Sequence, residues 1–212
     1  MMSDDSKMAE PTIAIRSGEL AGGLRYREAG AGTSVLCLGG GERFSPMRER
    51  LAARHRVVEP LAPALTVPAI GQSIMALSLD RFDLIAHGAH AALALQLALE
   101  RPKDIGALVL LAPTVLTRDG QCADDADASI VNRLGELKVP ILACFGTKDS
   151  IAPVEVARHY RARVPGCNLM FVYDSGHDME TERPEAVASL VLDFLERHDL
   201  FLVRRESDLI FP

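Results

Sequence analysis

The sequence lacks an excess of positive charge, long hydrophobic runs and cysteines in a metal-binding pattern. Its 23 Lys and Arg residues against 29 Asp and Glu give a net charge of −6, so we expect no nucleic-acid partner. No apolar run reaches the length that spans a bilayer, so we expect no membrane partner. The four cysteines lack zinc-site spacing and are typical of reduced cytosolic thiols. We therefore expect a soluble cytoplasmic protein without a metal or cofactor.

The chain has 212 residues, of which 48% are hydrophobic, and this suits one globular domain over residues 11–198. Residues 1–10 are polar and acidic, without the basic and then apolar order of a secretion signal, so we expect a flexible N-terminus. Residues 199–212 form a tail with several large apolar side chains that need cover. We expect this tail to pack on its own domain; the alternative is a homodimer through the tail.

Strand-like and helix-like segments alternate along the chain. The expected strands are residues 12–15, 24–28, 34–38, 56–59, 82–86, 107–111, 140–145 and 168–173. The expected helices are residues 46–55, 69–79, 91–99, 130–137, 154–164 and 183–198. The first two strands form an antiparallel pair, while the alternation that follows predicts a doubly wound, mostly parallel sheet with helices on both faces.

The stretch FDLIAHGAHAALALQLALERP, residues 82–102, organises this pattern. A short apolar strand turns at His87, Gly88 and Ala89 into a run of Ala and Leu, which are the best helix formers. The helix is apolar nearly all round, so it should be buried on most sides, and Pro102 stops it. A buried strand that turns sharply into a buried helix is the layout of a nucleophile elbow.

This stretch resembles the elbow of the α/β-hydrolase superfamily, Gly-x-Ser-x-Gly with His before the Ser. Without gaps, the pattern places Ala86 and His90 at the two glycines, His87 at the His and Gly88 at the Ser. The resemblance implies an α/β-hydrolase-like fold, but Gly88 leaves the nucleophile position vacant. The family's nucleophile is strained at positive φ, a conformation that glycine adopts readily, so a glycine there removes the nucleophile and relieves the strain.

Two further motifs resemble the rest of the family's triad. Asp149 lies in FGTKDSIAP, which is similar to the family's Gly-x-x-Asp-x-x-x-Pro and implies the triad acid. His177 lies in SGHDMETERP, which is similar to the catalytic His loop. In a triad the acid holds one imidazole nitrogen so that the other can act as a base. The alternative is a hydrogen bond that only ties two loops together.

The resemblance also implies an oxyanion hole, with Gly39, Gly40 and the amide of Ala89 as candidate donors. Before these glycines the family usually has His, and this sequence has Leu38. The family often carries a cap domain after the strand at 107–111. Residues 114–139 leave room for only a loop and one helix, which predicts a minimal cap.

His90 replaces a glycine that lets helix and strand pack closely. Its imidazole either points into the cleft or is a partly buried, hydrogen-bonded side chain. A shift of the elbow by two residues would instead place His90 at the nucleophile position. The ungapped match through Pro102 argues against that shift.

Two functional interpretations follow. In the first, which the three departures at Leu38, Gly88 and His90 favour, the protein is a degenerate hydrolase that binds a small acyl or carbonyl ligand or a partner. In the second, a hydrolase or lyase-type enzyme uses His177, oriented by Asp149, as a general base without a covalent intermediate. The second requires an open hollow in front of His177.

Deletion of residues 201–212 tests the role of the tail. Exposing its apolar side chains, or the surface that they cover, costs roughly 1.5–3 kcal/mol per large side chain. We therefore expect the truncated protein to show a lower melting temperature or a changed mass in solution, measured by calorimetry and light scattering. An unchanged temperature together with an unchanged mass would contradict this expectation.

Overall fold

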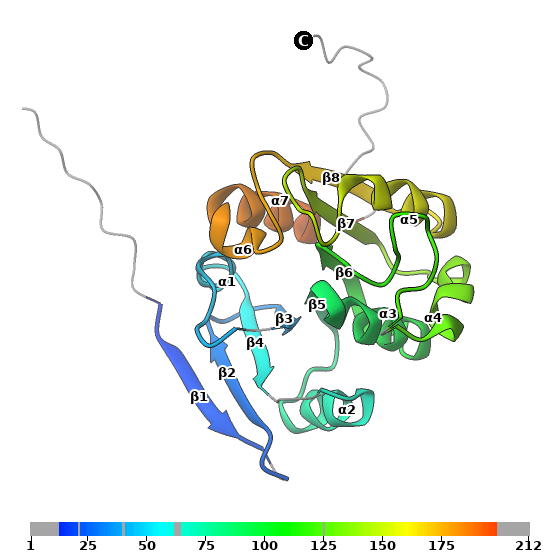
Figure 1. The fold of residues 1–212 in the computed structure, drawn as a ribbon. Coiled ribbons are helices and arrows are strands. Elements are labelled where there is room, and N and C mark those ends of the chain that lie inside the picture. The colour runs from blue at the N-terminus through cyan, green and yellow to red at the C-terminus, as the bar shows by residue number, and fades with distance from the viewer. Residues whose placement is uncertain (1–12, 21, 40, 62–64, 125, 199–212) are drawn as a thin grey trace, which may run out of the picture.

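The computed structural model describes residues 13–20, 22–39, 41–61, 65–124 and 126–198, so the expected flexible N-terminus, Gly40 and the apolar tail lie outside the described residues. An eight-stranded sheet has the order β1-β2-β4-β3-β5-β6-β7-β8 (Figure 1). β1, β2 and β4 pair antiparallel, and the remaining pairs are parallel, which confirms the predicted sheet. The strands are β1 (Ile15–Glu19), β2 (Arg25–Ala29), β3 (Ser34–Leu38), β4 (Arg56–Leu61), β5 (Phe82–His87), β6 (Ile105–Leu111), β7 (Ile141–Gly146) and β8 (Asn168–Val172).

Helices cover both faces of the sheet (Figure 1). One face carries α1 (Pro46–Leu51), α6 (Met179–Glu182) and α7 (Pro184–Arg197). The other face carries α2 (Val67–Ala76), α3 (Ala91–Glu100), α4 (Ala128–Asn132) and α5 (Ala157–Arg163). Short 3-10 turns, η1 (Gly88–His90), η2 (Leu134–Glu136) and η3 (Val154–Val156), precede or follow these helices.

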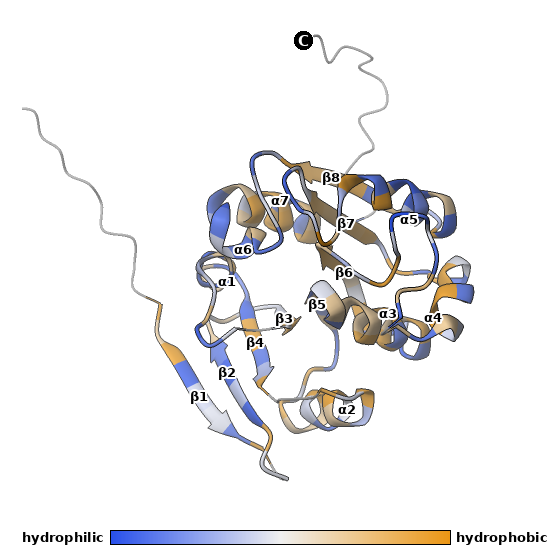
Figure 2. Cartoon of the chain, viewed as in Figure 1, coloured by the Kyte–Doolittle hydropathy of each residue, from blue (hydrophilic) through white to orange (hydrophobic). Residues whose placement is uncertain are grey.

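The central strands are buried on both faces, which explains their continuous apolar runs. Successive side chains of a strand point to opposite faces. In β3, Leu36 packs in the cluster under α2 and α3, whereas Val35 and Cys37 pack in the cluster under α1 and α7. The apolar colouring of the sheet interior and the polar outer faces of the helices show the same division (Figure 2). The four cysteines are free, and burial raises the pKa of Cys37, Cys144 and Cys167 to about 12.

Most predicted elements are present with shifted ends. The first strand begins at Ile15, three residues later than predicted, and α1 ends at Leu51 rather than His55 because the chain tightens there into i→i+3 turns. The predicted helix at 154–164 begins with η3 before α5. The one-turn helix α6 was not predicted from the sequence, because it begins without a side-chain cap.

Residues 114–139 pass over the α3 side of the sheet as turns, α4 and η2. An isolated bridge joins Leu116 to Cys122, and Asp127 caps α4 through its contact with the amide of Ser129. The amide of Thr114 donates to the carbonyl of Gly88 at 3.3 Å, so this segment begins directly beside the strand-to-helix turn. Within the described parts of the chain, no helix combines the length and the apolar character needed to cross a membrane.

Asp83 provides a test of how the buried sheet responds to pH. Its side chain is buried in β5, with Oδ1 3.7 Å from Nε2 of His198. Burial raises the pKa of Asp83 to about 6. A carboxyl whose pKa is higher in the folded than in the unfolded state destabilises the fold above its folded pKa, and this cost disappears below its unfolded pKa.

We therefore expect Asp83→Asn to increase the free energy of unfolding at pH 7.5 by roughly 1–2 kcal/mol. The advantage should shrink as pH falls from about 6 and vanish near pH 4, as measured by urea unfolding across this range. Asp119→Asn, at an exposed turn, is the control and should show no such trend. A destabilised Asp83→Asn at pH 7.5 would contradict the expectation.

Candidate functional site

Gly88 lies where β5 turns into η1 and α3, with φ of +57°, so the predicted positive φ at a strand-to-helix turn is confirmed. A Cβ atom built on Gly88 would lie 3.2 Å from Nε2 of His177. A side chain at position 88 would therefore project directly toward this imidazole. The positive φ lies at Gly88 and not at His90, whose φ is −67°, which favours the ungapped alignment over the shifted one.

Asp149 and His177 form the hydrogen bond that the sequence predicted. Asp149 follows β7, and its side chain is fully buried. Its Oδ1 accepts from the amides of Ile151 at 2.8 Å and Ala152 at 3.0 Å, which fixes the carboxylate. Its Oδ2 lies 2.9 Å from Nδ1 of His177. Asp149 therefore orients the imidazole so that Nδ1 donates and Nε2 is left to accept a proton.

His87 supports the loop that carries His177. Its Nε2 lies 2.8 Å from the carbonyl oxygen of His177, and the two imidazole rings are 4.9 Å apart. Since a carbonyl accepts, His87 donates through Nε2. The sequence aligned His87 with the histidine before the nucleophile without assigning it a role, and the structure places it as a support of the His177 backbone.

His90 packs against Gly39, at the start of the loop that follows β3 and is called the glycine loop (residues 39–42). A Cβ atom on Gly39 would lie 3.0 Å from Nδ1 of His90 and 3.0 Å from the carbonyl oxygen of His87, and Gly39 has φ of +87°. Only glycine fits there. Burial lowers the pKa of His90 below its ordinary value, against the opposing effect of a hydrogen bond with the His87 backbone. At neutral pH His90 is therefore a neutral, partly buried side chain that also lines the hollow described next.

A hollow of about 800 Å³ lies in front of the His177 imidazole, and Gly88, Ala89 and Gly39 line it as well. The His177 side chain is 26% exposed, so the imidazole is open to this space. Ala89 follows Gly88 in the first turn of η1, where backbone amides have no intrahelical acceptor. Apart from Ala89, the described lining side chains are apolar only at Phe44 and Pro46. The side chains that line the hollow are therefore mostly polar or charged.

Leu38 is fully buried under α2 and α3 and is not part of this lining. Among the residues that the structure describes, no group of three or more His, Cys, Asp or Glu side chains is placed to hold a metal ion.

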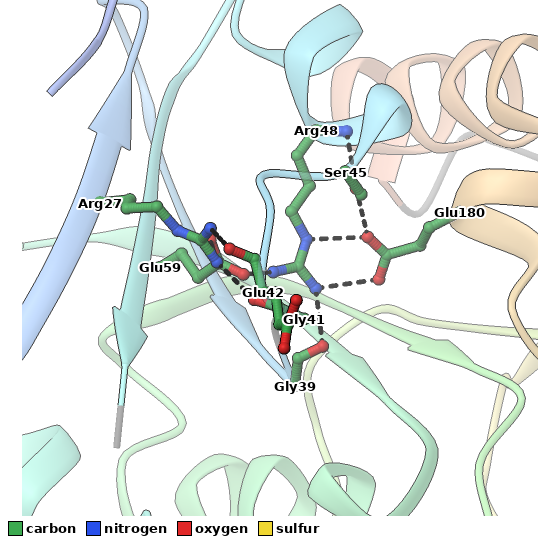
Figure 3. A network of polar contacts seen from close by, with 8 residues as sticks. All are labelled: Arg27, Gly39, Gly41, Glu42, Ser45, Arg48, Glu59 and Glu180. Atoms are coloured by element: carbon green, nitrogen blue, oxygen red, sulfur yellow. Dashed lines mark hydrogen bonds and ion pairs between the residues drawn. The ribbon is translucent and has the colours of Figure 1, made fainter. Parts of the chain in front are cut away.

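Sequence reasoning missed a buried network of charged side chains beside the hollow (Figure 3). Arg27 and Arg48 both pair with Glu59, and Arg48 also pairs with Glu180. Burial alone would lower the pKa of Arg48, but the nearby carboxylates, Glu180 foremost, raise it above its ordinary value. The available signal was Glu59, a carboxylate within an otherwise apolar strand segment.

No protein-family model matches the sequence. A pimeloyl-[acyl-carrier protein] methyl ester esterase of Neisseria meningitidis serogroup A is 28% identical over 153 residues, which cover 68% of this chain and 46% of that relative. The chain spans about half the length of the curated relatives of this kind that it matches.

Solved structures of hydrolases have the same fold. A bacterial membrane phospholipase A superposes with a TM-score of 0.70 at 14% identity, over 87% of this chain and 86% of that one. A serine hydrolase involved in carbazole degradation superposes with a TM-score of 0.69 at 20% identity, over 87% of this chain and 99% of that one. These likenesses show the α/β-hydrolase fold of the chain.

Introducing a hydroxyl at position 88 tests the geometry. In Gly88→Ser the new hydroxyl would lie beside Nε2 of His177, which can take its proton. We expect slow labelling by a serine-directed phosphonate probe, dependent on His177, because Ser at positive φ costs about 1–3 kcal/mol. Gly88→Ser with His90→Gly should label faster, because the loop at Gly39 is then released from the His90 ring.

Gly88→Ala is the matched control, since it carries the same backbone strain without an oxygen and should not label. Intact-mass spectrometry measures the reaction. Labelling of the wild type at another residue, or no labelling of either folded serine variant, would contradict this picture of the site.

Proposed function

We propose, on the premise that this chain has the α/β-hydrolase fold of its structural neighbours, that it binds a small acyl or carbonyl compound in the hollow without covalent catalysis. The observation that carries the proposal is that the imidazole of His177, held by Asp149, points at a backbone position without a side chain. The base and its orienting acid are present, while the oxygen on which a serine hydrolase depends is not.

Catalysis by the remaining groups should be weak. The members of a triad act as a unit, so loss of the nucleophile alone lowers the reaction rate about 10⁶-fold. The remaining groups still give a rate about 10³–10⁴-fold above that of the uncatalysed reaction in water. Gly88 also relieves the backbone strain that a serine would impose there. These effects support binding rather than turnover as the main activity of the site.

The lining indicates the class of ligand. A carbonyl oxygen of the ligand could accept from the backbone amide of Ala89, and His177 lines the same hollow. Curated relatives of the chain include pimeloyl-[acyl-carrier protein] methyl ester esterases. A short acyl ester fits both the polar lining and the chemistry of these relatives, so we propose this class of ligand.

The second candidate is an enzyme in which His177 activates water, or removes a substrate proton, with no acyl intermediate. The exposure of the His177 imidazole to the hollow favours this second candidate, because a general base must lie within reach of the proton that it removes. This candidate differs from the first in one measurable respect, which is the release of product.

Titration of the ¹⁵N-labelled wild type with methyl butanoate tests the proposal. We expect the amide chemical shifts of Gly88 and Ala89 to change saturably as the ester is added. Methanol should be released no faster than in buffer without protein. His177→Gln should weaken the binding because it removes the imidazole at the wall of the hollow. His159→Gln should not weaken it, because His159 contacts the carbonyl of Arg118 and does not line the hollow.

The two candidates separate in the same samples. Methanol release that disappears in both His177→Gln and Asp149→Asn would identify the general-base enzyme. Absence of any shift at Gly88 and Ala89 up to the solubility limit of the ester would reject binding of this ligand class.

A further inference from the structure

The charged network beside the hollow is attached to the backbone of the glycine loop. Arg27, on β2, donates from Nη1 to the carbonyl of Glu42 at 2.9 Å and from Nη2 to the carbonyl of Gly41 at 2.8 Å. Arg48, on α1, donates from Nη2 to the carbonyl of Gly39 at 3.3 Å. Two buried guanidinium groups therefore hold carbonyls at both ends of this loop (Figure 3).

Carboxylates from two other elements hold these guanidinium groups in place. Glu59, on β4, is fully buried between Arg27 and Arg48, with Oε2 2.8 Å from Nη2 of Arg27. Glu180, on α6, lies 2.8 Å from Nε and 2.9 Å from Nη2 of Arg48, and it accepts from Ser45 at 2.6 Å. Because buried charges are costly unless they are paired, these pairs define one arrangement of the network.

The two carbonyls that Arg27 binds are consecutive in the chain. In a trans peptide the C=O and the following N–H point in opposite directions, and the structure contains no cis peptide among its described residues. Since the carbonyls of Gly41 and Glu42 point to Arg27, the amides of Glu42 and Arg43 point away from it. Two successive amides on one side of the backbone form a concave arrangement that suits an anionic or carbonyl oxygen.

These amides have no acceptor within the described chain. Neither the Glu42 nor the Arg43 amide donates a hydrogen bond to another described group. Gly41, Glu42 and Arg43 all line the hollow that also contains Gly88 and His177. The loop thus presents two unused donors at the wall of the candidate site.

We propose that Arg27 is a positioning residue, which turns the amides of Glu42 and Arg43 into the hollow as donors to an oxygen of the ligand. This inference rests on the proposed function of the hollow, and it adds a second polar subsite to that of Ala89. Glu59 sets the orientation of Arg27, and Arg48 fixes the start of the same loop. A lysine could replace the charge of Arg27, but not the planar fork that reaches two carbonyls and Glu59 together.

Three variants test the role of Arg27. Arg27→Met removes the fork and the charge, whereas Arg27→Lys keeps the charge beside Glu59. Arg56→Met is the matched control, because Arg56 also pairs with a strand glutamate, Glu28, but donates to the carbonyl of Leu77 instead of to carbonyls that line the hollow. The readouts are the amide chemical shifts of Glu42 and Arg43, the midpoint of urea unfolding and the Kd for methyl butanoate.

We expect Arg27→Lys to keep the unfolding midpoint near that of the wild type while the two amide resonances shift and the Kd rises about tenfold, the worth of roughly one hydrogen bond. Arg27→Met should show the same shifts with a lower midpoint, and Arg56→Met should leave both resonances unchanged. Arg27→Lys carries the test by itself should Arg27→Met fail to fold. If Arg27 had only a structural role, Arg27→Lys would match the wild type in the amide chemical shifts, the unfolding midpoint and the Kd.

Wild-type resonances of Glu42 and Arg43 that stay in place in Arg27→Lys would overturn the inference. A wild type that binds no methyl butanoate would instead reject the ligand class of the proposed function, and the amide shifts would still decide the role of Arg27. Binding with shifts at Ala89 but none at Glu42 or Arg43 would likewise overturn the inference while the proposed function stands.

Discussion

The turn from β5 into α3 is the constraint on which the site depends. The chain must leave a buried strand and enter a buried helix within three residues, and Gly88 accomplishes this at φ of +57°. The same turn directs position 88 at His177, because a Cβ atom built on Gly88 would lie 3.2 Å from Nε2 of the imidazole. Glycine makes the turn without strain. The turn therefore directs position 88 at the imidazole of His177, although glycine supplies no side chain there.

The second constraint is the pairing of buried charges at the other wall of the hollow. A buried charge destabilises a fold unless it is paired and hydrogen bonded, so Arg27, Arg48, Glu59 and Glu180 stabilise each other as a group. Arg27 and Arg48 also donate hydrogen bonds to backbone carbonyls of the loop. The carbonyls of Gly39, Gly41 and Glu42 are thereby held by paired guanidinium groups, at residues that line the same hollow as His177. Gly88, Ala89 and His90 line one part of the hollow, and Arg48 and Glu180 of this network line another.

Periodicity predicted the elements well where burial is uniform and less well at their ends. β3 has the predicted residues, because its apolar run is covered on both faces and ends at a glycine. α1 ends four residues early, and α6 was missed, because one-turn helices and their ends depend on local contacts rather than on a long apolar stripe. The Asp149 and His177 pair was predictable because the motifs around both residues resemble those of the α/β-hydrolase superfamily.

By itself the sequence determined the alternation of strands and helices, the glycine at position 88 and the chain order of Gly88, Asp149 and His177, since each is carried by local pattern and spacing. Only the tertiary structure decided that Asp149 lies 2.9 Å from His177, that the imidazole faces an open hollow and that His90 packs against Gly39. The charged network was beyond local reasoning, because Arg48 and Glu180 are separated by 132 residues. Charge pairing at such separations leaves no periodic signal in the sequence and exists only once the sheet brings α1 and α6 to the same face.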